Sequence, residues 1–465
     1  MSFGWHSGSE KVARGSRGTS STGREVQIRE RLLYDREMLY RIALPDRAGY
    51  EGTQGLIDRK GRVVLAPTNV SVGPFHDGLA AVAVDYSHYG FVDLEGRWAI
   101  EPRFYRVGTF AEGRCLVEIL EGDTTRFVFI DATGREVFPF EDSRSRYVEA
   151  TVTFSEGRLP VTRGGKVGFL DRSGALVIEP QFEQVLPFRE GLAPACLAGQ
   201  WGMIDLEGRW VIEPRWMRAF CFQNGVAAVV SAGRNVDSPF LREHKKDDGV
   251  DEFRGLWGLV DRGGQYLHRP AFDYVETELA TSMALVDRGV LGPTRFVEGR
   301  AIVRVGGKKW GLLRNDGSLC GAPNLEKLGE PSEGLALAKK KVKGKSLWGF
   351  VDLEGEWVLP PTFAHVQWPL ARFSEGMCPI GAPVTPDQGT AFRAIAQYGQ
   401  QAFGYVDRSG VFTITPRFWQ AMPFEHGLAL VGTEKGRGYI DVRGELVWEA
   451  AAPTEVLPPP STLGE

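Results

Sequence analysis

A stretch near the middle of the chain places three carboxylates among apolar side chains. It reads WGMIDLEGRWVIEPRW and runs from Trp201 to Trp216, and its carboxylates are Asp205, Glu207 and Glu213. Two carboxylates in surroundings that push their pKa values apart can divide the roles of general acid and general base, as in the hydrolysis of glycosides. This segment is therefore the first candidate for catalytic chemistry.

The same arrangement of residues recurs along most of the chain, which favours a structural role for it. Nine of ten copies have an aspartate three residues before a glycine, and eight have a proline six residues after that glycine. Catalytic pairs occur once per active site, whereas turn residues recur with every turn. We therefore interpret Asp205 as a turn residue, and Glu207 and Glu213 as surface carboxylates. The copies of the glycine are Gly61, Gly96, Gly134, Gly174, Gly208, Gly264, Gly317, Gly355, Gly410 and Gly444.

The residues on either side of this turn have the pattern of short β-strands. Runs such as GFVD and RWAIEP have four to six apolar or alternating residues, and D-x-x-G between them is typical of a hairpin turn. The aspartate can accept hydrogen bonds from the turn amides, and the glycine can take a positive φ. The proline is expected to end the second strand, because it cannot donate to the sheet. The aromatic residue two positions later, for example Phe104, is expected to pack between neighbouring units.

A second turn motif, F-x-E-G, follows each proline and precedes an apolar run such as LALV. Its glycine permits a bend into this run, and its phenylalanine is expected to point inward. One unit therefore makes about three short strands, which cannot bury their own apolar face, so neighbouring units must cover one another. The motif begins at Phe75, Phe110, Phe154, Phe188, Phe222, Phe296, Pro331, Phe373 and Phe424.

This order of elements resembles the WG-containing repeat family, also called KWG repeats. The resemblance covers roughly residues 39 to 448, and Trp-Gly itself stands at Trp201, Trp257, Trp310 and Trp348. It implies a β-rich bacterial repeat protein, usually without a defined biochemical activity. It provides no catalytic or ligand-binding residues to transfer to this chain.

The expected fold is all-β, with about ten units stacked as an open β-solenoid. A solenoid accepts any number of units, whereas a closed propeller usually has ~4–8 blades of four strands. One propeller or two propellers is the alternative. The expected organisation is a disordered tail at 1–24, an N-terminal cap with a short helix and a strand at 25–54, the repeat array at 55–450, and a disordered proline-rich tail at 451–465.

Three insertions interrupt the repeats, at 231–255, 273–295 and 381–402. The first and last both follow the LALV-type run, so we expect them to leave one side of the array. The second contains a pattern that fits a helix. Long loops on a rigid scaffold are common sites of binding residues, although they can also be tolerated surface elaborations.

Composition narrows the classes of partner and site. The net charge of −4 offers no overall basic field for nucleic acid, and the basic run Lys339 to Lys345 is local. The five cysteines lack a CxxC spacing and the seven histidines lack a metal-type spacing, so we expect buried free thiols and no metal or cofactor. No apolar leader or 18-residue apolar run occurs, which favours a cytoplasmic protein without membrane insertion.

These observations favour a non-enzymatic scaffold that binds protein or peptide partners through one edge or face of the array and its inserted loops. The alternative is a module that binds carbohydrate or the cell envelope through a row of exposed aromatic residues. An enzyme with its site in the insertions is a third hypothesis, for which a deep pocket with paired carboxylates would be the sign. The sequence does not specify the partner or the oligomeric state.

Overall fold

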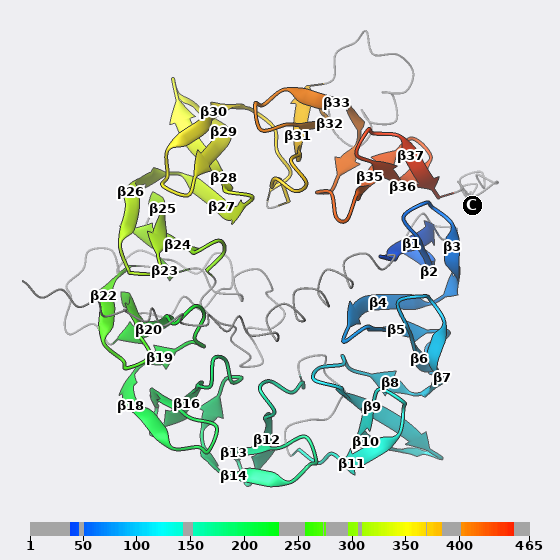
Figure 1. The fold of residues 1–465 in the computed structure, drawn as a ribbon, viewed down its shortest axis with the longest axis vertical. Helices are drawn as coiled ribbons and strands as arrows, with labels where there is room; N and C mark the ends of the chain where they lie inside the picture. Colours follow the sequence, from blue (N-terminus) through cyan, green and yellow to red (C-terminus); the bar gives the residue numbers. More distant parts are fainter. Residues whose placement is uncertain are drawn as a thin grey trace, which may run out of the picture. The chain divides into compact units, whose positions relative to one another are not determined.

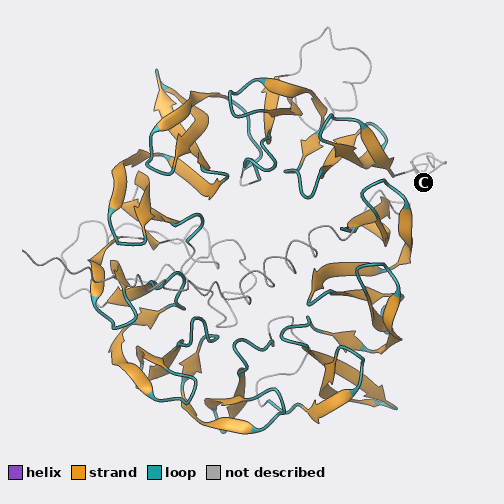
Figure 2. Ribbon diagram, in the orientation of Figure 1, coloured by secondary structure: helices purple, strands orange, loops and turns teal. Residues whose placement is uncertain are grey.

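The computed structural model describes residues 38–45, 51–142, 152–231, 256–272, 274–275, 296–305, 309–368, 370–383 and 401–450. All regular elements in these ranges are β-strands, arranged in ten small antiparallel sheets (Figure 2). Each sheet is built from one continuous part of the chain, and we number them 1 to 10 in chain order. Each contains one copy of the repeated glycine turn, which is D-x-x-G in nine sheets and has Arg314 in place of the aspartate in sheet 7. The predicted all-β class and the ten units are confirmed.

Three of the sheets have three strands. Sheet 1 contains β1 (Tyr40–Pro45), β2 (Glu51–Ile57) and β3 (Val63–Asn69); sheet 4 contains β12 (Leu159–Arg163), β13 (Lys166–Leu170) and β14 (Leu176–Phe182); sheet 9 contains β31 (Cys378–Pro383), β32 (Gln401–Val406) and β33 (Phe412–Phe418).

The other seven sheets have four strands. Sheet 2 contains β4 (Ser71–His76), β5 (Leu79–Ala83), β6 (Tyr89–Val92) and β7 (Trp98–Phe104); sheet 3 contains β8 (Arg106–Val107), β9 (Arg114–Glu121), β10 (Thr124–Asp131) and β11 (Glu136–Pro139); sheet 5 contains β15 (Gln184–Val185), β16 (Ala193–Leu197), β17 (Gln200–Ile204) and β18 (Trp210–Trp216). Sheet 6 contains β19 (Arg218–Ala219), β20 (Ala227–Ser231), β21 (Leu256–Val260) and β22 (Tyr266–Phe272); sheet 7 contains β23 (Tyr274–Val275), β24 (Arg300–Val305), β25 (Lys309–Arg314) and β26 (Leu319–Leu325). Sheet 8 contains β27 (Lys327–Ser332), β28 (Leu335–Val342), β29 (Lys345–Asp352) and β30 (Trp357–Phe363); sheet 10 contains β34 (Gln420–Ala421), β35 (Leu428–Thr433), β36 (Gly436–Asp441) and β37 (Leu446–Glu449).

The boundary of a sheet falls inside the unit that the sequence suggests. In the seven four-stranded sheets the F-x-E-G turn joins the first two strands, whereas in sheets 4 and 9 it precedes the first strand. In every sheet the D-x-x-G turn, or its counterpart at Gly317, joins the last two strands. In sheet 5, for example, Glu190 and Gly191 lie between β15 and β16, and Gly208 lies between β17 and β18. Each copy of the sequence motif therefore contributes strands to two neighbouring sheets.

The array closes on itself, because sheet 10 packs against sheet 1. The rings of Tyr40 and Tyr439 meet edge to face with their centroids 5.5 Å apart. The Tyr40 hydroxyl donates to the carbonyl of His426 at 2.7 Å, and the Tyr439 hydroxyl donates to the carbonyl of Arg41 at 2.8 Å. The ten sheets thus form one propeller-type ring (Figure 1), and the predicted open solenoid is wrong. The number of units does not decide closure; the complementarity of the two end sheets does.

The core of the ring lies between neighbouring sheets. One cluster joins Phe91, Ile100 and Phe104 of sheet 2 to Cys115 and Val128 of sheet 3, and all five are buried. An equivalent cluster joins sheets 4 and 5, and another joins sheets 9 and 10. The predicted packing of Phe104 between units is confirmed, and each sheet buries apolar surface that it could not cover alone.

The proline of the motif does not end its strand, contrary to the expectation. The strand β18 passes through Pro214 to Trp216, and its pairing with β17 shifts register opposite Gly202. A Cβ on Gly202 would lie 2.8 Å from the Pro214 nitrogen, so the second residue of Trp-Gly makes room for a bulge. Proline is tolerated here because β18 is the last strand of its sheet and the bulge removes the need for a donor.

Several expected features lie outside the described residues. These include the tails 1–24 and 451–465, the helix expected within 25–54, and most of the insertions 231–255, 273–295 and 381–402. The strand expected in the cap is present as β1, which pairs with β2 as part of sheet 1. No helix in the described ranges has the length and apolar character needed to cross a membrane.

Candidate functional site

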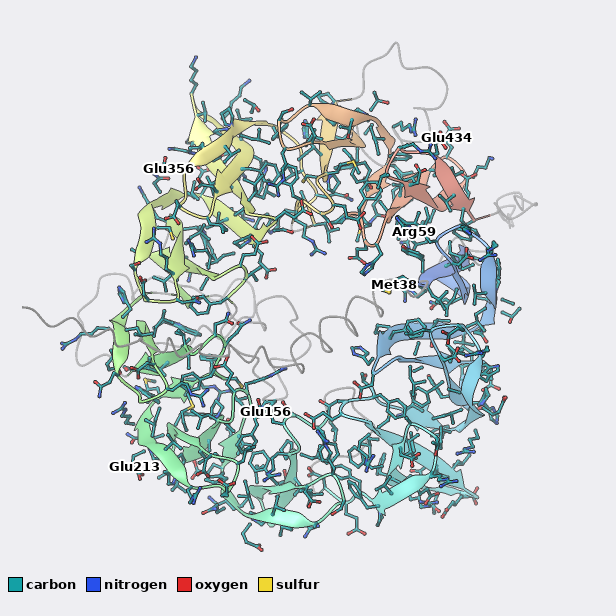
Figure 3. The ribbon with its side chains drawn as sticks, viewed as in Figure 1. Met38, Arg59, Glu156, Glu213, Glu356 and Glu434 are labelled. Atoms are coloured by element: carbon teal, nitrogen blue, oxygen red, sulfur yellow. The ribbon has the colours of Figure 1, made fainter. Side chains whose placement is uncertain are left out.

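The carboxylates of the opening motif lie in a turn and on an outer strand. The Asp205 carboxylate accepts from the amides of Glu207 at 3.1 Å and Arg209 at 2.9 Å, and also from Arg209 Nε at 2.8 Å. Partial burial raises the pKa of Asp205, but these hydrogen bonds outweigh it and hold the pKa below its ordinary value. The structure does not bring Glu213 to this turn, because it is exposed on the outer strand β18 (Figure 3). The hydrogen bonds predicted for the turn aspartate are thus present.

The F-x-E-G turns are two-residue hairpin turns in which the first of the two residues, the glutamate, is unusual. In the copy at Glu156, φ is +51° for the glutamate and +73° for Gly157, while Ser155 and Arg158 exchange backbone hydrogen bonds of 3.0 and 3.1 Å. Two positive φ values in succession define a turn that favours Asn-Gly or Asp-Gly. Glutamate has no local hydrogen bond that compensates for this conformation. The presence of glutamate at this position must therefore be explained by a contact outside the turn.

This contact is a hydrogen bond to the next sheet. The Glu156 carboxylate accepts from the amide of Gly191 at 2.8 Å, where Gly191 is the glycine of the following F-x-E-G turn. The same link occurs at seven junctions between sheets and connects the turns in series. Sequence reasoning missed it, although the recurrence of glutamate at a positive-φ position was a signal for it. The acceptors are Asp77, Glu112, Glu156, Glu190, Glu298, Glu333 and Glu375, and their respective donors are the amides of Gly113, Gly157, Gly191, Gly225, Gly334, Gly376 and Gly427.

Other recurring polar residues reinforce the same junctions. The Ser155 hydroxyl donates to the carbonyl of Phe188 in the next sheet at 2.7 Å. Arg158 donates to the carbonyl of Leu206 through Nε at 3.1 Å and through Nη2 at 3.0 Å. Arg172 of sheet 4 donates to Glu112 of sheet 3 at 2.7 Å. These bonds connect the F-x-E-G and D-x-x-G turns, so both kinds of turn lie on one face, which we call the turn face.

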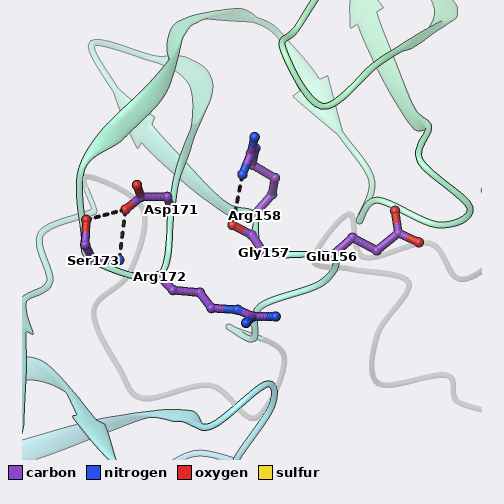
Figure 4. Close-up of a pocket in the computed structure, with 6 residues that line it drawn as sticks. All are labelled: Glu156, Gly157, Arg158, Asp171, Arg172 and Ser173. Atoms are coloured by element: carbon purple, nitrogen blue, oxygen red, sulfur yellow. Dashed lines mark hydrogen bonds between the residues drawn. The ribbon is translucent and has the colours of Figure 1, made fainter. Parts of the chain in front are cut away.

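The turn face has a shallow hollow at sheet 4. Its volume is about 430 Å³, and Figure 4 shows the six residues that line it. The polar side chains in it already have partners inside the ring. Asp171 accepts from the amide and hydroxyl of Ser173, and Glu156, Arg158 and Arg172 make the links to neighbouring sheets described above. The hollow is lined by Glu156, Gly157, Arg158, Asp171, Arg172 and Ser173.

The titratable groups of the interior serve packing. All five cysteines are buried and free, as predicted, and burial raises the pKa of Cys115 to about 12. The Arg218 guanidinium lies 4.3 Å from the centre of the Trp201 ring and donates to Gln184 at 3.1 Å, and burial lowers its pKa to about 10. Among the described residues, no three side chains of His, Cys, Asp or Glu are placed to hold a metal ion.

Comparison with known proteins identifies the repeat. The model of the WG-containing repeat matches six segments, at residues 55–86, 89–121, 168–201, 201–233, 348–380 and 403–434. The chain is a WG-containing repeat protein. No curated protein matches its sequence.

Several solved structures resemble the WG-repeat ring at low sequence identity. A crystal structure of the eukaryotic initiation factor is 11% identical, with 81% of this chain and 95% of that chain covered and a TM-score of 0.45. BamB from Moraxella catarrhalis is 11% identical, with 66% and 96% covered and a TM-score of 0.31. PorZ from Porphyromonas gingivalis is 9% identical, with 88% and 53% covered and a TM-score of 0.26. Function does not follow from similarity of this kind.

The WG-repeat ring presents a second face at the opposite ends of its strands. The insertion 231–255 joins β20 to β21, the second and third strands of sheet 6. The insertion 381–402 joins β31 to β32, which are the equivalent strands of the three-stranded sheet 9. Since the strands are antiparallel, these joins lie opposite the turn face, and we call this the hairpin face. Both insertions therefore leave the same face, as predicted. The insertion 273–295 joins β23 to β24, the first two strands of sheet 7, and leaves the turn face.

The exposed aromatic residues of the described ranges are scattered. Trp201, Trp257 and Trp348 of the WG motif are buried. The large exposed aromatics are Trp368, Tyr86 and Tyr266, which lie in three different parts of the ring. The row of stacking residues that would favour carbohydrate binding is not present in this part of the chain.

Proposed function

We propose that this protein is a non-enzymatic scaffold that binds a protein or peptide partner through the hairpin face. The observation that carries the proposal is the use of the recurring polar groups. The carboxylates, serines and arginines of the two turn motifs form hydrogen bonds from one sheet to the next, so they build the ring rather than a reaction centre.

The links between sheets give the ring the stiffness that a scaffold needs. A carboxylate that accepts from a backbone amide makes a charge-assisted hydrogen bond, which is stronger than a neutral one. Seven such links join neighbouring sheets in addition to the apolar clusters between them. Loops held by a rigid framework lose less entropy on binding than loops on a mobile one.

The hairpin face is the proposed binding face because two of the three insertions leave it. The chain departs at Ser231 and returns at Leu256, and departs at Pro383 and returns at Gln401. A cytoplasmic location without a cofactor is part of the proposal, and five buried free thiols are compatible with a reducing compartment.

Shortened loops test the proposal. One variant replaces both 232–255 and 384–400 by short glycine-rich linkers, and the matched control shortens only 276–295 on the turn face. We expect partners captured from cell extract by the full chain to be retained by the control and lost from the double-loop variant. Thermal unfolding of the purified variants confirms that each ring is intact.

A direct measurement must follow the capture. The partner is purified and its affinity for each variant is measured by calorimetry, where at least about a tenfold loss is expected for the double-loop variant. Equal affinity of the full chain and the double-loop variant would contradict the proposal. Absence of any reproducible partner of the intact chain would contradict it too.

A further inference from the structure

One hairpin of the hairpin face is longer than most of its counterparts and carries a run of lysines. The strands β28 and β29 have eight residues each, whereas the equivalent strands β16 and β17 of sheet 5 have five. The added length carries Lys339, Lys340 and Lys341 on one strand and Lys343 and Lys345 around the turn.

Two tryptophans form a floor beneath these lysines. The rings of Trp348 and Trp368 stack with their centroids 5.2 Å apart and an angle of 24° between their planes. Lys339 Nζ lies 5.3 Å from the centre of the Trp348 ring, and Lys327 Nζ lies 5.3 Å from that of Trp368. Trp348 is buried, but Trp368 is 39% exposed, which is the largest exposure of any described tryptophan. The aromatic rings hold both ammonium groups in place at the surface.

The lysines lie unusually close to one another for a β-sheet. Lys327 and Lys339 are directly paired across β27 and β28. Like charges opposite one another destabilise a sheet. Lys341, two residues after Lys339 on the same strand, lies on the same side of the hairpin and is exposed. Two carboxylates lie near these strands: Glu326, just before β27, accepts from the Ser346 hydroxyl at 2.7 Å, and Glu330 is part of β27.

A second long hairpin shows that the length of the strands does not require this excess of charge. The strands β9 and β10 of sheet 3 also have eight residues each. There Arg126 pairs with Glu121 at 2.6 Å and with Glu136 at 2.7 Å, so opposite charges balance within the sheet. Sheet 8 instead leaves several positive charges next to an exposed indole.

We propose that Lys327, Lys339, Lys341, Trp348 and Trp368 form a docking surface, the lysine–tryptophan surface, for an extended acidic segment of a protein partner. Carboxylates of the segment pair with the three ammonium groups, and an apolar side chain contacts the exposed ring of Trp368. The inference rests on the proposed scaffold function and adds the chemistry of its partner. An acidic peptide fits better than a polynucleotide, because the basic surface is local, contains no arginine and belongs to a chain of net charge −4.

The probe is a fluorescein-labelled peptide of about ten glutamates, titrated with the full-length protein. The variant K327E/K341E reverses two exposed charges of the surface. The matched control R163E/K166E reverses two charges at the turn between β12 and β13, which is the hairpin-face turn of sheet 4. It changes the net charge by the same amount as K327E/K341E. We expect at least about tenfold weaker binding for K327E/K341E and less than about twofold for the control, with affinity falling as salt is added.

A second variant reports on the aromatic floor. Binding of the unlabelled peptide is expected to change the tryptophan fluorescence of the natural protein, and Trp368→Ala is expected to remove most of this change and weaken binding. If K327E/K341E does not fold, Lys341→Gln replaces it, because Lys341 is exposed and its neutralisation leaves Lys327 over Trp368.

Three results would overturn the inference: no binding of the peptide at low salt, equal losses in the two double variants, or tighter binding of a ten-nucleotide single-stranded RNA. These results are distinguishable from failure of the scaffold proposal. A ring that keeps its loop-dependent partner but ignores the acidic peptide contradicts only the lysine–tryptophan surface. A ring that binds the peptide but has no loop-dependent partner contradicts only the role of the loops.

Discussion

Two kinds of junction hold the ring together, and they differ in the residues that make them. At an ordinary junction, such as that between sheets 3 and 4, Glu112 accepts from the amide of Gly157 at 2.8 Å and from Arg172 at 2.7 Å. At the closing junction, between sheets 10 and 1, the hydroxyls of Tyr40 and Tyr439 donate to backbone carbonyls instead.

The difference follows from the composition of sheet 1. This sheet has three strands and no F-x-E-G motif in its sequence, so the glycine that donates at ordinary junctions has no counterpart among its described residues. His426 stands where a glutamate stands in most other turns, and its carbonyl accepts from Tyr40. Burial raises the pKa values of Tyr40 and Tyr439 to about 12, so both hydroxyls remain donors at neutral pH. Recurring carboxylate links therefore build the array, and tyrosine hydroxyls of the two end sheets close it.

The largest effect is expected from breaking the closing junction. Tyr40→Ala removes a buried ring, its contact with Tyr439 and its hydrogen bond, so the free energy of unfolding should fall by about 3 kcal/mol or more. Urea denaturation followed by circular dichroism measures this loss.

The conservative variant separates the ring from the hydroxyl. Tyr40→Phe keeps the aromatic contact and loses only the bond to the His426 carbonyl, so a loss of about 1 kcal/mol is expected. Equal stability of Tyr40→Ala and the natural protein would show that the ring is not held closed by this contact.

A substitution at an ordinary junction should lower the free energy of unfolding less, because each link there is one of several. Glu156→Ala removes the acceptor of the Gly191 amide and keeps the strained turn, so a loss of about 1.5 kcal/mol is expected. Glu213→Ala, on the exposed outer strand, is the control and should change stability by less than about 0.5 kcal/mol. Equal effects of the two substitutions in urea denaturation would refute the structural role of the link.

The features of the fold that could be predicted from the sequence are those determined by residues close together in the chain or by adjacent units. The turn at Gly208 could be inferred because the aspartate three residues earlier accepts from amides of the same turn. The inward packing of Phe104 could be inferred from the apolar pattern and the need of each unit for a neighbour. In both cases the cause lies within one unit or its neighbour.

What the sequence did not reveal depends on residues far apart or on the combination of two motifs. Closure rests on Tyr439 and Arg41, which are 398 positions apart, and no repeat pattern marks them as partners. The continuation of β18 through Pro214 depends on the space left by Gly202 in another strand. The link from Glu156 to Gly191 joins copies of a motif that we interpreted only as a local turn. The lysine run, which the sequence marks only as a local basic run, has a tryptophan partner in Trp348 that the sequence pattern does not show.

Acid should weaken ordinary junctions in a way that can be measured at Glu112. Partial burial raises the pKa of Glu112, but the hydrogen bonds from Arg172 and the Gly157 amide outweigh it and lower the pKa overall. The stabilisation is therefore complete above the unfolded pKa of about 4.3 and is lost as the pH falls through the lower folded pKa. The difference in stability between the natural protein and Glu112→Gln should be about 1 kcal/mol at pH 7 and shrink below about pH 4.

Urea midpoints at pH 7, 5, 4 and 3 would follow this convergence. Glu213→Gln is the control, because its carboxylate is exposed on the outer strand, and its curve should stay parallel to that of the natural protein. A constant gap between Glu112→Gln and the natural protein at every pH would show that the charge of Glu112 does not stabilise the junction.

The smallest effect is expected from adding a link where the series is interrupted. Between sheets 6 and 7 the turn carries Asn224, with φ of +54°, and the bonds to the next sheet come from Gln223, which donates to the Phe296 carbonyl at 3.2 Å and accepts from its amide at 2.8 Å. Asparagine adopts positive φ more readily than glutamate, but its side chain is one methylene shorter. Asn224→Glu therefore gains reach toward the amide of Gly299, the glycine of the next F-x-E-G turn, but adopts a positive φ less readily.

The new hydrogen bond and the less favourable backbone conformation of Asn224→Glu change the free energy of unfolding in opposite directions, so their sum measures the net contribution of the link. A new charge-assisted hydrogen bond contributes about 1.5 kcal/mol, and the less favourable backbone conformation costs about 1 kcal/mol. A gain of about 0.5 kcal/mol is expected in urea denaturation. The reverse substitution Glu156→Asn, at a junction that has the link, should lose about as much. If Asn224→Glu and Glu156→Asn both stabilise the protein or both destabilise it, the glutamates serve the turns themselves and not the junctions between sheets.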